Sequence, residues 1–214
     1  MIALFVFAVG YLLGSVQPGL LIGRIWRGVD VREYGSGKTG FTNTLRTVGI
    51  APALLVVTLD IAKGAVPVLL GRLVFDDPLA ASLGGLGSVI GHIFPLLAGF
   101  RGGRGVATSF GAFFAMAPVP ALGAALTGLT VLGLTRYVSM MSMVCVPAGL
   151  LGMAVYVALG WLHPAYLIFG VAVTVAVEVS HIGNFRRLIA GTEPKVGQGG
   201  SRRPNGPVRP AGSA

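Results

Sequence analysis

The sequence is poor in charge. Of its 214 residues, 11% are Asp, Glu, Lys or Arg, whereas 54% are hydrophobic. A soluble domain carries about 25% charged residues, so this composition excludes an ordinary soluble globule, a disordered chain and a nucleic-acid-binding domain with a polar surface. It predicts a polytopic membrane protein, whose helices present apolar side chains to lipid.

Acidic residues and cysteine are especially scarce. Seven Asp and Glu stand against sixteen Lys and Arg, which gives a formal net charge of +9. In a membrane protein such basic residues mark topology and bind anions, so they do not indicate nucleic acid. The single cysteine, Cys145, excludes an intrachain disulfide. The three histidines are scattered, and no carboxylate stands at ligand spacing, so we expect no metal and no cofactor.

Long apolar runs are abundant, and a membrane helix needs about 20 such residues. Residues 106–135 form a run that is too long for one helix, and Pro118 and Pro120 divide it into two. The other runs are residues 1–23, 50–71, 79–98, 138–160 and 165–179. We therefore predict an all-α polytopic membrane protein with seven transmembrane helices and loop or re-entrant motifs on its cytoplasmic face.

The basic connections between the runs predict the orientation. Cytoplasmic segments are rich in Lys and Arg, which assigns residues 24–46, 100–104 and 180–195 to the inside and residues 72–78 to the outside. Division of the 106–135 run also puts Arg136 inside, whereas a single helix there would give six spans and break the rule. We expect an outer N-terminus and one integral domain, residues 1–196. Residues 197–214, rich in Gly, Pro, Ser and Arg, are predicted to be a disordered cytoplasmic tail.

The first polar segment, residues 32–46, reads REYGSGKTGFTNTLR and is typical of an anion-binding loop. Its glycines let the backbone turn so that N–H groups line a concave anion site. Glu33 stands where a nucleotide-binding P-loop needs glycine, and no βαβ unit surrounds the segment, so we reject nucleotide binding. A flexible linker with basic topology markers explains the composition equally well. The candidate ligands are Gly35, Ser36, Gly37, Lys38, Thr42, Asn43 and Arg46.

Two later segments have the same character. In FRGGRGVAT, residues 100–108, three glycines surround Arg104 at a predicted helix start, where free N–H groups favour an anion. In residues 181–188, three polar side chains recur every three residues and share one helix face. The alternatives are a positive-inside arginine pair and a capped helix end. The candidates are Gly102, Gly103, Arg104, Gly105 and Thr108, then His181, Asn184 and Arg187, together with His92, which taken alone is more typical of a packed histidine.

Only one charged pair lies clearly inside an apolar run. Asp60 and Lys63 stand three residues apart on one helix face, where they are expected to neutralise each other as a structural pair. A transporter or channel for a small phosphorylated anion would place polar residues deep in several spans, so it is kept as the alternative function. A pure scaffold would leave three glycine-rich basic motifs without a role.

Together, the three segments resemble the PlsY family, the bacterial membrane glycerol-3-phosphate acyltransferases that use acyl phosphate. Three motifs in order carry the resemblance: Gly14-Ser15 and residues 19–23, 30–32 and 35–37; residues 91–95 and 100–108; residues 181–184, 187–188 and 191–193. Asp60 and Lys63-Gly64 also fit. The chain departs from the family at Lys38, where Asn is usual, and at Arg104, where Lys is usual.

The resemblance implies a reaction and roles for residues. An acyl chain would pass from acyl phosphate to the sn-1 hydroxyl of glycerol 3-phosphate, giving lysophosphatidic acid and phosphate, the first step of phospholipid synthesis. The implied catalytic residues are Ser36, Arg46, Arg104, His181 and Asn184. A monomer is expected in the bacterial inner membrane, among membrane lipids, with its active site facing the cytoplasm and the soluble enzyme that forms acyl phosphate as a partner.

Overall fold

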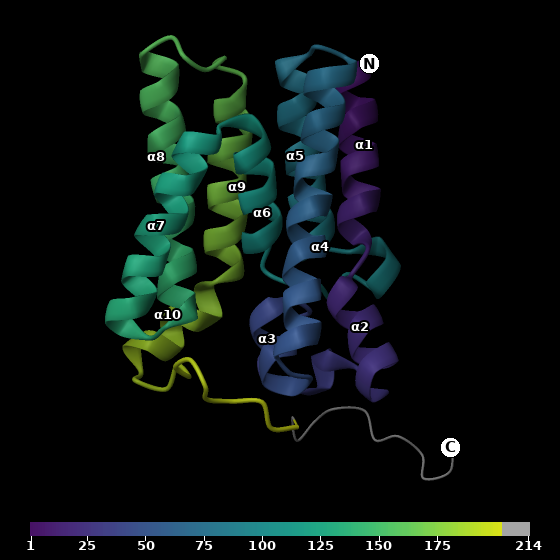
Figure 1. Cartoon of the computed structure of the whole chain (residues 1–214), viewed down its shortest axis with the longest axis vertical. Helices are drawn as coiled ribbons and strands as arrows, with labels where there is room; N and C mark the ends of the chain where they lie inside the picture. Colours follow the sequence, from purple (N-terminus) through teal and green to yellow (C-terminus); the bar gives the residue numbers. More distant parts are fainter. Residues whose placement is uncertain (203–214) are drawn as a thin grey trace.

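Helices packed side by side make up the body of the molecule in the computed structural model, which describes residues 1–202 (Figure 1). The α-helices are α1 (Ile2–Ser15), α2 (Pro18–Arg27), α3 (Phe41–Thr47), α4 (Ile50–Leu69), α5 (Pro78–Ile93), α6 (Val106–Met116), α7 (Pro118–Thr135), α8 (Val138–Ala158), α9 (Tyr166–Ser180) and α10 (Ile182–Ile189). Short turns of 3-10 helix, η1 (Val31–Glu33) and η3 (Leu96–Ala98), and of π-helix, η2 (Leu70–Val74), extend this framework. The all-α prediction is confirmed for these residues.

The apolar helices have the length that a bilayer requires. In residues 1–202, five helical segments are long and apolar enough to cross a membrane, and α9 with α10, bent by 51°, makes a sixth. Helix α6 is also apolar but has only 11 residues. The polytopic prediction therefore holds, whereas length and composition support five or six spans rather than the predicted seven.

Prolines set several helix boundaries. Pro118 begins α7 directly after α6 ends at Met116, as the sequence predicted. Pro18 begins α2 in the same way and divides the predicted 1–23 helix into α1 and α2, a break that the sequence analysis missed. Proline lacks the backbone N–H that a helix interior needs, but it fits a first turn, where that N–H has no partner within the helix.

Small residues bring α1 and α5 into close contact. A Cβ atom on Gly10 would collide with the carbonyl oxygen of Gly84, and one on Gly14 would collide with that of Ser88. Backbones that approach this closely are typical of membrane helices that pack through small residues. A second core, between α6, α8 and α9, includes the edge-to-face ring pair Phe113–Phe169, whose centroids lie 4.9 Å apart.

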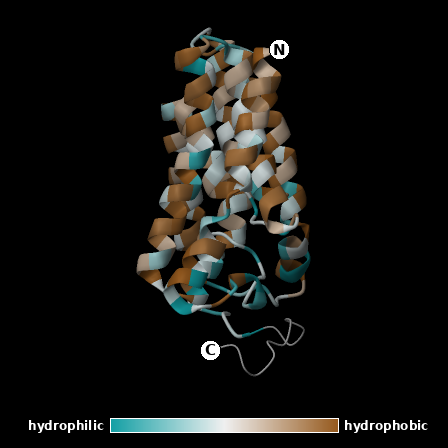
Figure 2. Ribbon diagram, turned by 90° about the vertical axis from the view of Figure 1, so that its right-hand side faces the viewer, coloured by the Kyte–Doolittle hydropathy of each residue, from teal (hydrophilic) through white to brown (hydrophobic). Residues whose placement is uncertain are grey.

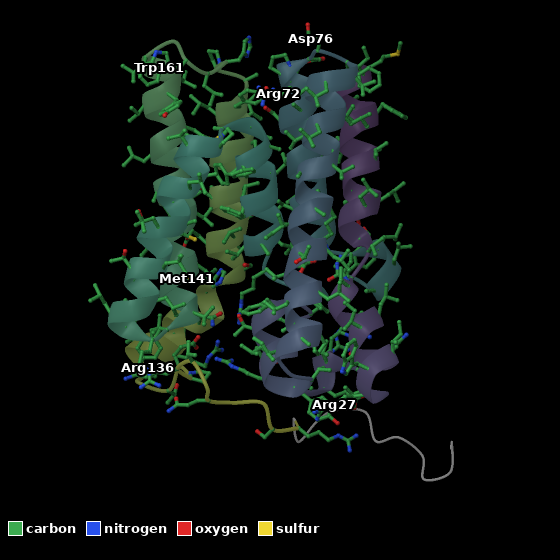
Figure 3. The ribbon with its side chains drawn as sticks, in the orientation of Figure 1. Arg27, Arg72, Asp76, Arg136, Met141 and Trp161 are labelled. Atoms are coloured by element: carbon green, nitrogen blue, oxygen red, sulfur yellow. The ribbon has the colours of Figure 1, made fainter. Side chains whose placement is uncertain are left out.

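The two ends of the bundle differ. Hydrophobic residues dominate along the helices and hydrophilic ones gather toward the ends (Figure 2). Arg27 and Arg136 lie at one end, and Asp76 and Trp161 lie at the other (Figure 3). At the arginine end, residues 194–202, here called the strap, run from below α10 to below α3 (Figure 1). The remainder of the predicted disordered tail, residues 203–214, lies outside the described residues.

Candidate active site

The first polar segment forms a fixed turn. Gly35 and Gly37 have φ values of +49° and +69°, a region that favours glycine. The buried Asn43 side chain holds the turn: its amide donates to the carbonyls of Val31 at 2.7 Å and Lys38 at 2.9 Å, and its oxygen accepts from the Ser36 N–H at 3.0 Å. Because both ends of this amide are used within the loop, its predicted contact with substrate stays a prediction.

Arg46 lies in the last turn of α3 and faces the strap. Its Nη2 atom is 3.5 Å from the carbonyl oxygens of both Pro194 and Lys195. Burial lowers the pKa of Arg46 and outweighs the opposing effect of the Glu193 charge. An arginine in this setting is still a cation at neutral pH and presents a planar fork to phosphate.

The second segment places Arg104 at the start of α6. Gly105 is the N-cap residue of this helix, with φ of +86°, so the loop turns directly before the free N–H groups of the first turn. Burial lowers the pKa of Arg104 to about 10, which leaves its side chain charged at neutral pH. Its buried Nε atom has no hydrogen-bond partner among the described residues, nor has the hydroxyl of Thr108 one turn further.

The third segment is organised around Glu193. This buried carboxylate accepts hydrogen bonds from Nδ2 of Asn184 at 2.6 Å and from Nε of Arg187 at 2.7 Å, so these two residues share a face of α10 as predicted. Burial raises the pKa of Glu193, but its interactions with Asn184, Ser139 and Arg187, including the charge of Arg187, outweigh burial and hold the pKa below its usual value. Glu193 is therefore an anion that fixes the polar face of α10.

His181 stands at the bend between α9 and α10 and is 1% exposed. Its Nδ1 atom lies 2.8 Å from the carbonyl oxygen of Val177. A carbonyl oxygen only accepts hydrogen bonds, so this contact assigns the ring proton to Nδ1. The Nε2 atom of this neutral imidazole keeps its lone pair, which suits an acceptor of a hydroxyl proton.

Contacts show that the three segments meet. Arg46 of the first segment faces the carbonyl oxygens of Pro194 and Lys195, and the hydroxyl of Ser180, directly before the third segment, lies 3.3 Å from the carbonyl oxygen of Arg104. The charges of Glu193, Arg187 and Arg46 act on Arg104, and those of Arg104, Glu193 and Lys38 act on His181. The polar groups brought together in this way are Lys38, Arg46, Arg104, His181, Asn184, Arg187 and Glu193. Gly102 and Gly103 precede Arg104 in the same loop. Ser36 on the first loop and Thr42 in the first turn of α3 are half-buried. Several cations around one carboxylate form a site suited to phosphorylated anions.

His92 has a different environment. Its ring is 3% exposed, with Nδ1 3.4 Å from Oδ1 of Asp60, which also pairs with Nζ of Lys63 at 2.8 Å. The structural pair predicted for Asp60 and Lys63 is confirmed. The Nε2 side of the ring packs against Gly103, where a Cβ atom would collide with it. His92 is thus linked to the second loop, and its own predicted contact with substrate stays a prediction.

Two residues with central places were not among the predicted site residues. Glu193 was noted only as part of a motif. It is the one acidic residue after Glu178, in a stretch rich in arginine, and this isolation indicates that it pairs with those arginines. Gln17 was overlooked because it lies inside an apparently continuous apolar run. Its position directly before Pro18 marked a helix break at which a buried amide has backbone groups to bind.

Comparison with known proteins identifies relatives along nearly the whole chain. A sequence profile described as glycerol-3-phosphate acyltransferase matches residues 4–191. The glycerol-3-phosphate acyltransferase of Synechococcus sp. (strain JA-3-3Ab) is 46% identical over 195 residues, covering 91% of this chain and 94% of its own. That of Shouchella clausii (strain KSM-K16) is 41% identical, covering 88% of this chain and 93% of its own.

Two crystal structures are also similar to this fold. Both are of PlsY (YgiH), an integral membrane glycerol 3-phosphate acyltransferase. The glycerol 3-phosphate form is 36% identical with a TM-score of 0.84, covering 91% of this chain and 96% of the other. The lysophosphatidic acid form is 34% identical with a TM-score of 0.81, covering 90% and 94%.

Proposed function

Because this chain belongs to the PlsY family of glycerol-3-phosphate acyltransferases and produces lysophosphatidic acid, we propose that its cationic site binds glycerol 3-phosphate and an acyl phosphate together. The observation that carries the proposal is the gathering of arginines around Glu193: Arg187 donates to its carboxylate at 2.7 Å, and Arg46 faces the carbonyl oxygens of the next two residues. Two phosphorylated substrates repel each other, and closely spaced cations offset that repulsion.

The proposed division of roles follows the two loops. The turn of residues 35–38, with Thr42, Asn43 and Arg46, forms one phosphate cradle. Arg104, with the backbone of residues 102–105 and the Thr108 hydroxyl, forms the other and stabilises the negative charge that develops on the acyl phosphate. The unpartnered, buried Nε atom of Arg104 supports this assignment, since a buried donor needs an acceptor. Arg104 in place of the family's usual Lys keeps the charge, and Lys38 adds one.

His181, Asn184 and Arg187 orient glycerol 3-phosphate in this scheme. The sn-1 hydroxyl oxygen attacks the acyl carbonyl carbon, a new C–O ester bond forms, and the C–O bond to phosphate breaks with release of inorganic phosphate. The hydroxyl proton passes either to Nε2 of His181 or to an oxygen of the acyl phosphate. The neutral ring of His181, with its proton on Nδ1, supports the first route.

The acyl chain is proposed to lie in an apolar groove between helices. A small apolar cavity of about 40 Å³ opens beside Val106, two residues after Arg104, and Phe110, Phe113 and Cys145 line it further in. Its walls carry no charged group, which suits a hydrocarbon chain.

Seven crossings, with the N-terminus outside and the site at the cytoplasmic face of a bacterial inner membrane, remain our proposal for the topology. The break between α6 and α7 supports a reversal of the chain there. Arg27 and Arg136 at one end of the bundle, and Asp76 at the other, support the orientation (Figure 3). Access from the cytoplasm agrees with supply of acyl phosphate by a soluble enzyme, and a monomer suffices for the proposed site.

Purified protein tests the proposal through release of phosphate from acyl phosphate in the presence of glycerol 3-phosphate. Arg46→Ala and Arg104→Ala should each lower the rate at least about 100-fold, because each removes a charge that stabilises the transition state. The matched controls are Arg27→Ala and Arg101→Ala, neighbouring exposed arginines that should retain near-normal rates. Near-normal activity of Arg46→Ala or Arg104→Ala would remove that residue from the mechanism.

A covalent route through Ser36 predicts a different intermediate. Incubation with labelled acyl phosphate in the absence of glycerol 3-phosphate would then leave a labelled acyl group on the protein. Ser36→Ala would abolish this labelling. We expect no acyl-enzyme, because acyl phosphate is already activated and direct attack needs no protein nucleophile.

A further inference from the structure

A closed ring of buried polar groups surrounds the break between α1 and α2. Nζ of Lys63 donates to the carbonyl oxygen of Val16 at 2.7 Å and pairs with Oδ1 of Asp60 at 2.8 Å, which lies 3.4 Å from Nδ1 of His92. The carbonyl oxygen of His92 in turn lies 3.4 Å from Nε2 of Gln17, the residue after Val16. The ring therefore joins α4 and α5 to the helix break.

Gln17 connects this ring to both loops of the proposed site. Its Oε1 atom accepts a hydrogen bond from the hydroxyl of Thr39, in the first loop, at 2.5 Å. Its Nε2 atom donates to the carbonyls of Gly14 at 3.1 Å and of His92. That His92 carbonyl also accepts the N–H of Gly103, in the second loop, at 3.1 Å. The Gln17 amide thus bonds to Thr39 of the first loop and to the His92 carbonyl, which also binds Gly103 of the second loop.

These hydrogen bonds are buried, so each polar group depends on its protein partner. Thr39 is 1% exposed, His92 3% and Gln17 4%, so water does not compete for their polar groups. A buried amide or hydroxyl without a partner is costly, and here the Gln17 amide and the Thr39 hydroxyl satisfy each other. The two loops are consequently held at one separation rather than a range of separations.

We propose that Gln17 is a positioning residue for acyl transfer, which sets the distance between the loop of residues 35–40 and the loop of residues 102–105. Two phosphate groups held on different loops meet in reactive geometry only if that distance is fixed. Where the protein does not fix it, part of the binding energy of the substrates is used to order the loops. The inference rests on the proposed assignment of these loops to the two phosphates.

Thr39→Val tests the link with little change in side-chain shape, because a methyl group replaces the hydroxyl. We expect kcat/KM for both substrates to fall about five- to tenfold, the effect of one lost buried hydrogen bond. The fall should lie in KM, since binding must then order loops that are no longer held. Thr39→Ser, which keeps the hydroxyl, should restore KM to within about twofold of the original.

Gln17→Leu removes the same link from the other side. The double variant Gln17→Leu with Thr39→Val should have the KM of Gln17→Leu alone, because the two changes break one connection. The control is Thr44→Val, a buried threonine whose hydroxyl donates to the Gly40 carbonyl at the start of its own helix and to no other group among residues 1–202. Thr44→Val should lower the melting temperature about as much as Thr39→Val does, and it should leave KM unchanged.

The outcomes separate positioning from a general effect on folding. Unchanged KM for Thr39→Val, or effects of Thr39→Val and Gln17→Leu that multiply in the double variant, would overturn the proposal. If Gln17→Leu does not fold, the comparison of Thr39→Val with Thr39→Ser still decides. The same assay of Arg46→Ala and Arg104→Ala tests the loops as phosphate sites, and near-normal activity of these variants would refute that assignment. If they are inactive but Thr39→Val has a normal KM, the site assignment stands and the positioning role of Gln17 fails.

Discussion

Side chains from distant segments converge on Glu193, and its carboxylate balances a cluster of like charges. Asn184 and Arg187 donate to it directly, and Arg46 and Arg104 lie within its field. Without an anion at this position, the arginines would repel one another whenever no substrate phosphate is bound. The carboxylate therefore keeps the cationic site assembled between turnovers.

Glu193→Gln should lower stability, because the amide keeps the shape of the side chain and removes its charge. We expect a loss of about 1–3 kcal/mol, as for a charged hydrogen bond with a buried partner, measured by thermal unfolding in detergent. The control is Glu33→Gln, which removes a carboxylate that pairs with the exposed Arg202 at 3.5 Å. Equal stability of Glu193→Gln and the unaltered protein would contradict this role.

The same carboxylate makes stability depend on pH. Its pKa in the folded protein lies below the ordinary value of 4.5, so its contribution is fully present above pH 4.5 and is lost as the pH falls through the folded pKa. The difference in melting temperature between the unaltered protein and Glu193→Gln should thus be constant near neutral pH and shrink below pH 4.5. Thermal unfolding over a pH series measures it, and a difference that persists in acid would refute the assignment.

At this scale the sequence predicts cations better than their partners. Arg104 stands out because glycines surround it, and Arg46 stands out because it ends a glycine-rich polar segment in a chain with little other charge. The partners of buried amides depend on residues far away in the chain. Gln17 meets Thr39 and His92 across 22 and 75 positions, and no local pattern indicates either contact.

Among the helices, the contact between α1 and α5 leaves no space for an added methyl group. Gly10 of α1 faces backbone atoms of α5, which do not rotate away as a side chain does. Gly10→Ala should therefore destabilise the protein by about 1–3 kcal/mol, the usual cost of overpacking. Gly133→Ala in α7, where nothing lies within 4 Å of the added methyl, should be neutral or slightly stabilising.

Thermal unfolding in the same detergent compares these two variants. Equal melting temperatures of Gly10→Ala and Gly133→Ala would show that α1 and α5 are not in close contact. Both changes add one methyl group within a helix, so helix propensity cancels in the comparison.

A helix boundary could be predicted where an apolar run was too long for one span, but not where the run had the length of a single span. The break at Pro118 was predicted because the apolar run was too long for one helix. The break at Pro18 was missed because residues 1–23 have the length of one span and contain no charge. The polar groups that stabilise this second break, on Lys63 and Gln17, become recognisable only when α4 is seen beside it.

For the molecule as a whole, the proposed topology predicts which positions are reached from each side of the membrane. Single cysteines replace Asp76 and Trp161 at one end and Arg27 and Arg136 at the other, in a Cys145→Ala background (Figure 3). A membrane-impermeant thiol reagent should label Asp76→Cys and Trp161→Cys in intact cells. The other two should react only after permeabilisation. Labelling of Arg136→Cys in intact cells would contradict seven crossings.

The strap touches the site through its main chain. Arg46 faces the carbonyl oxygens of Pro194 and Lys195, and the N–H of Gly35 donates to the carbonyl of Ser201 at 3.0 Å. Every amino acid supplies that oxygen, so substitution of Pro194, Lys195 or Ser201 leaves it in place, whereas deletion of one residue shifts each contact. Gly200 is an exception in the strap, because a Cβ atom there would collide with the carbonyl oxygen of Arg46. The family profile ends at residue 191. In the strap beyond it, the spacing of the main-chain groups of Pro194, Lys195 and Ser201 matters more than the side chains that these residues carry.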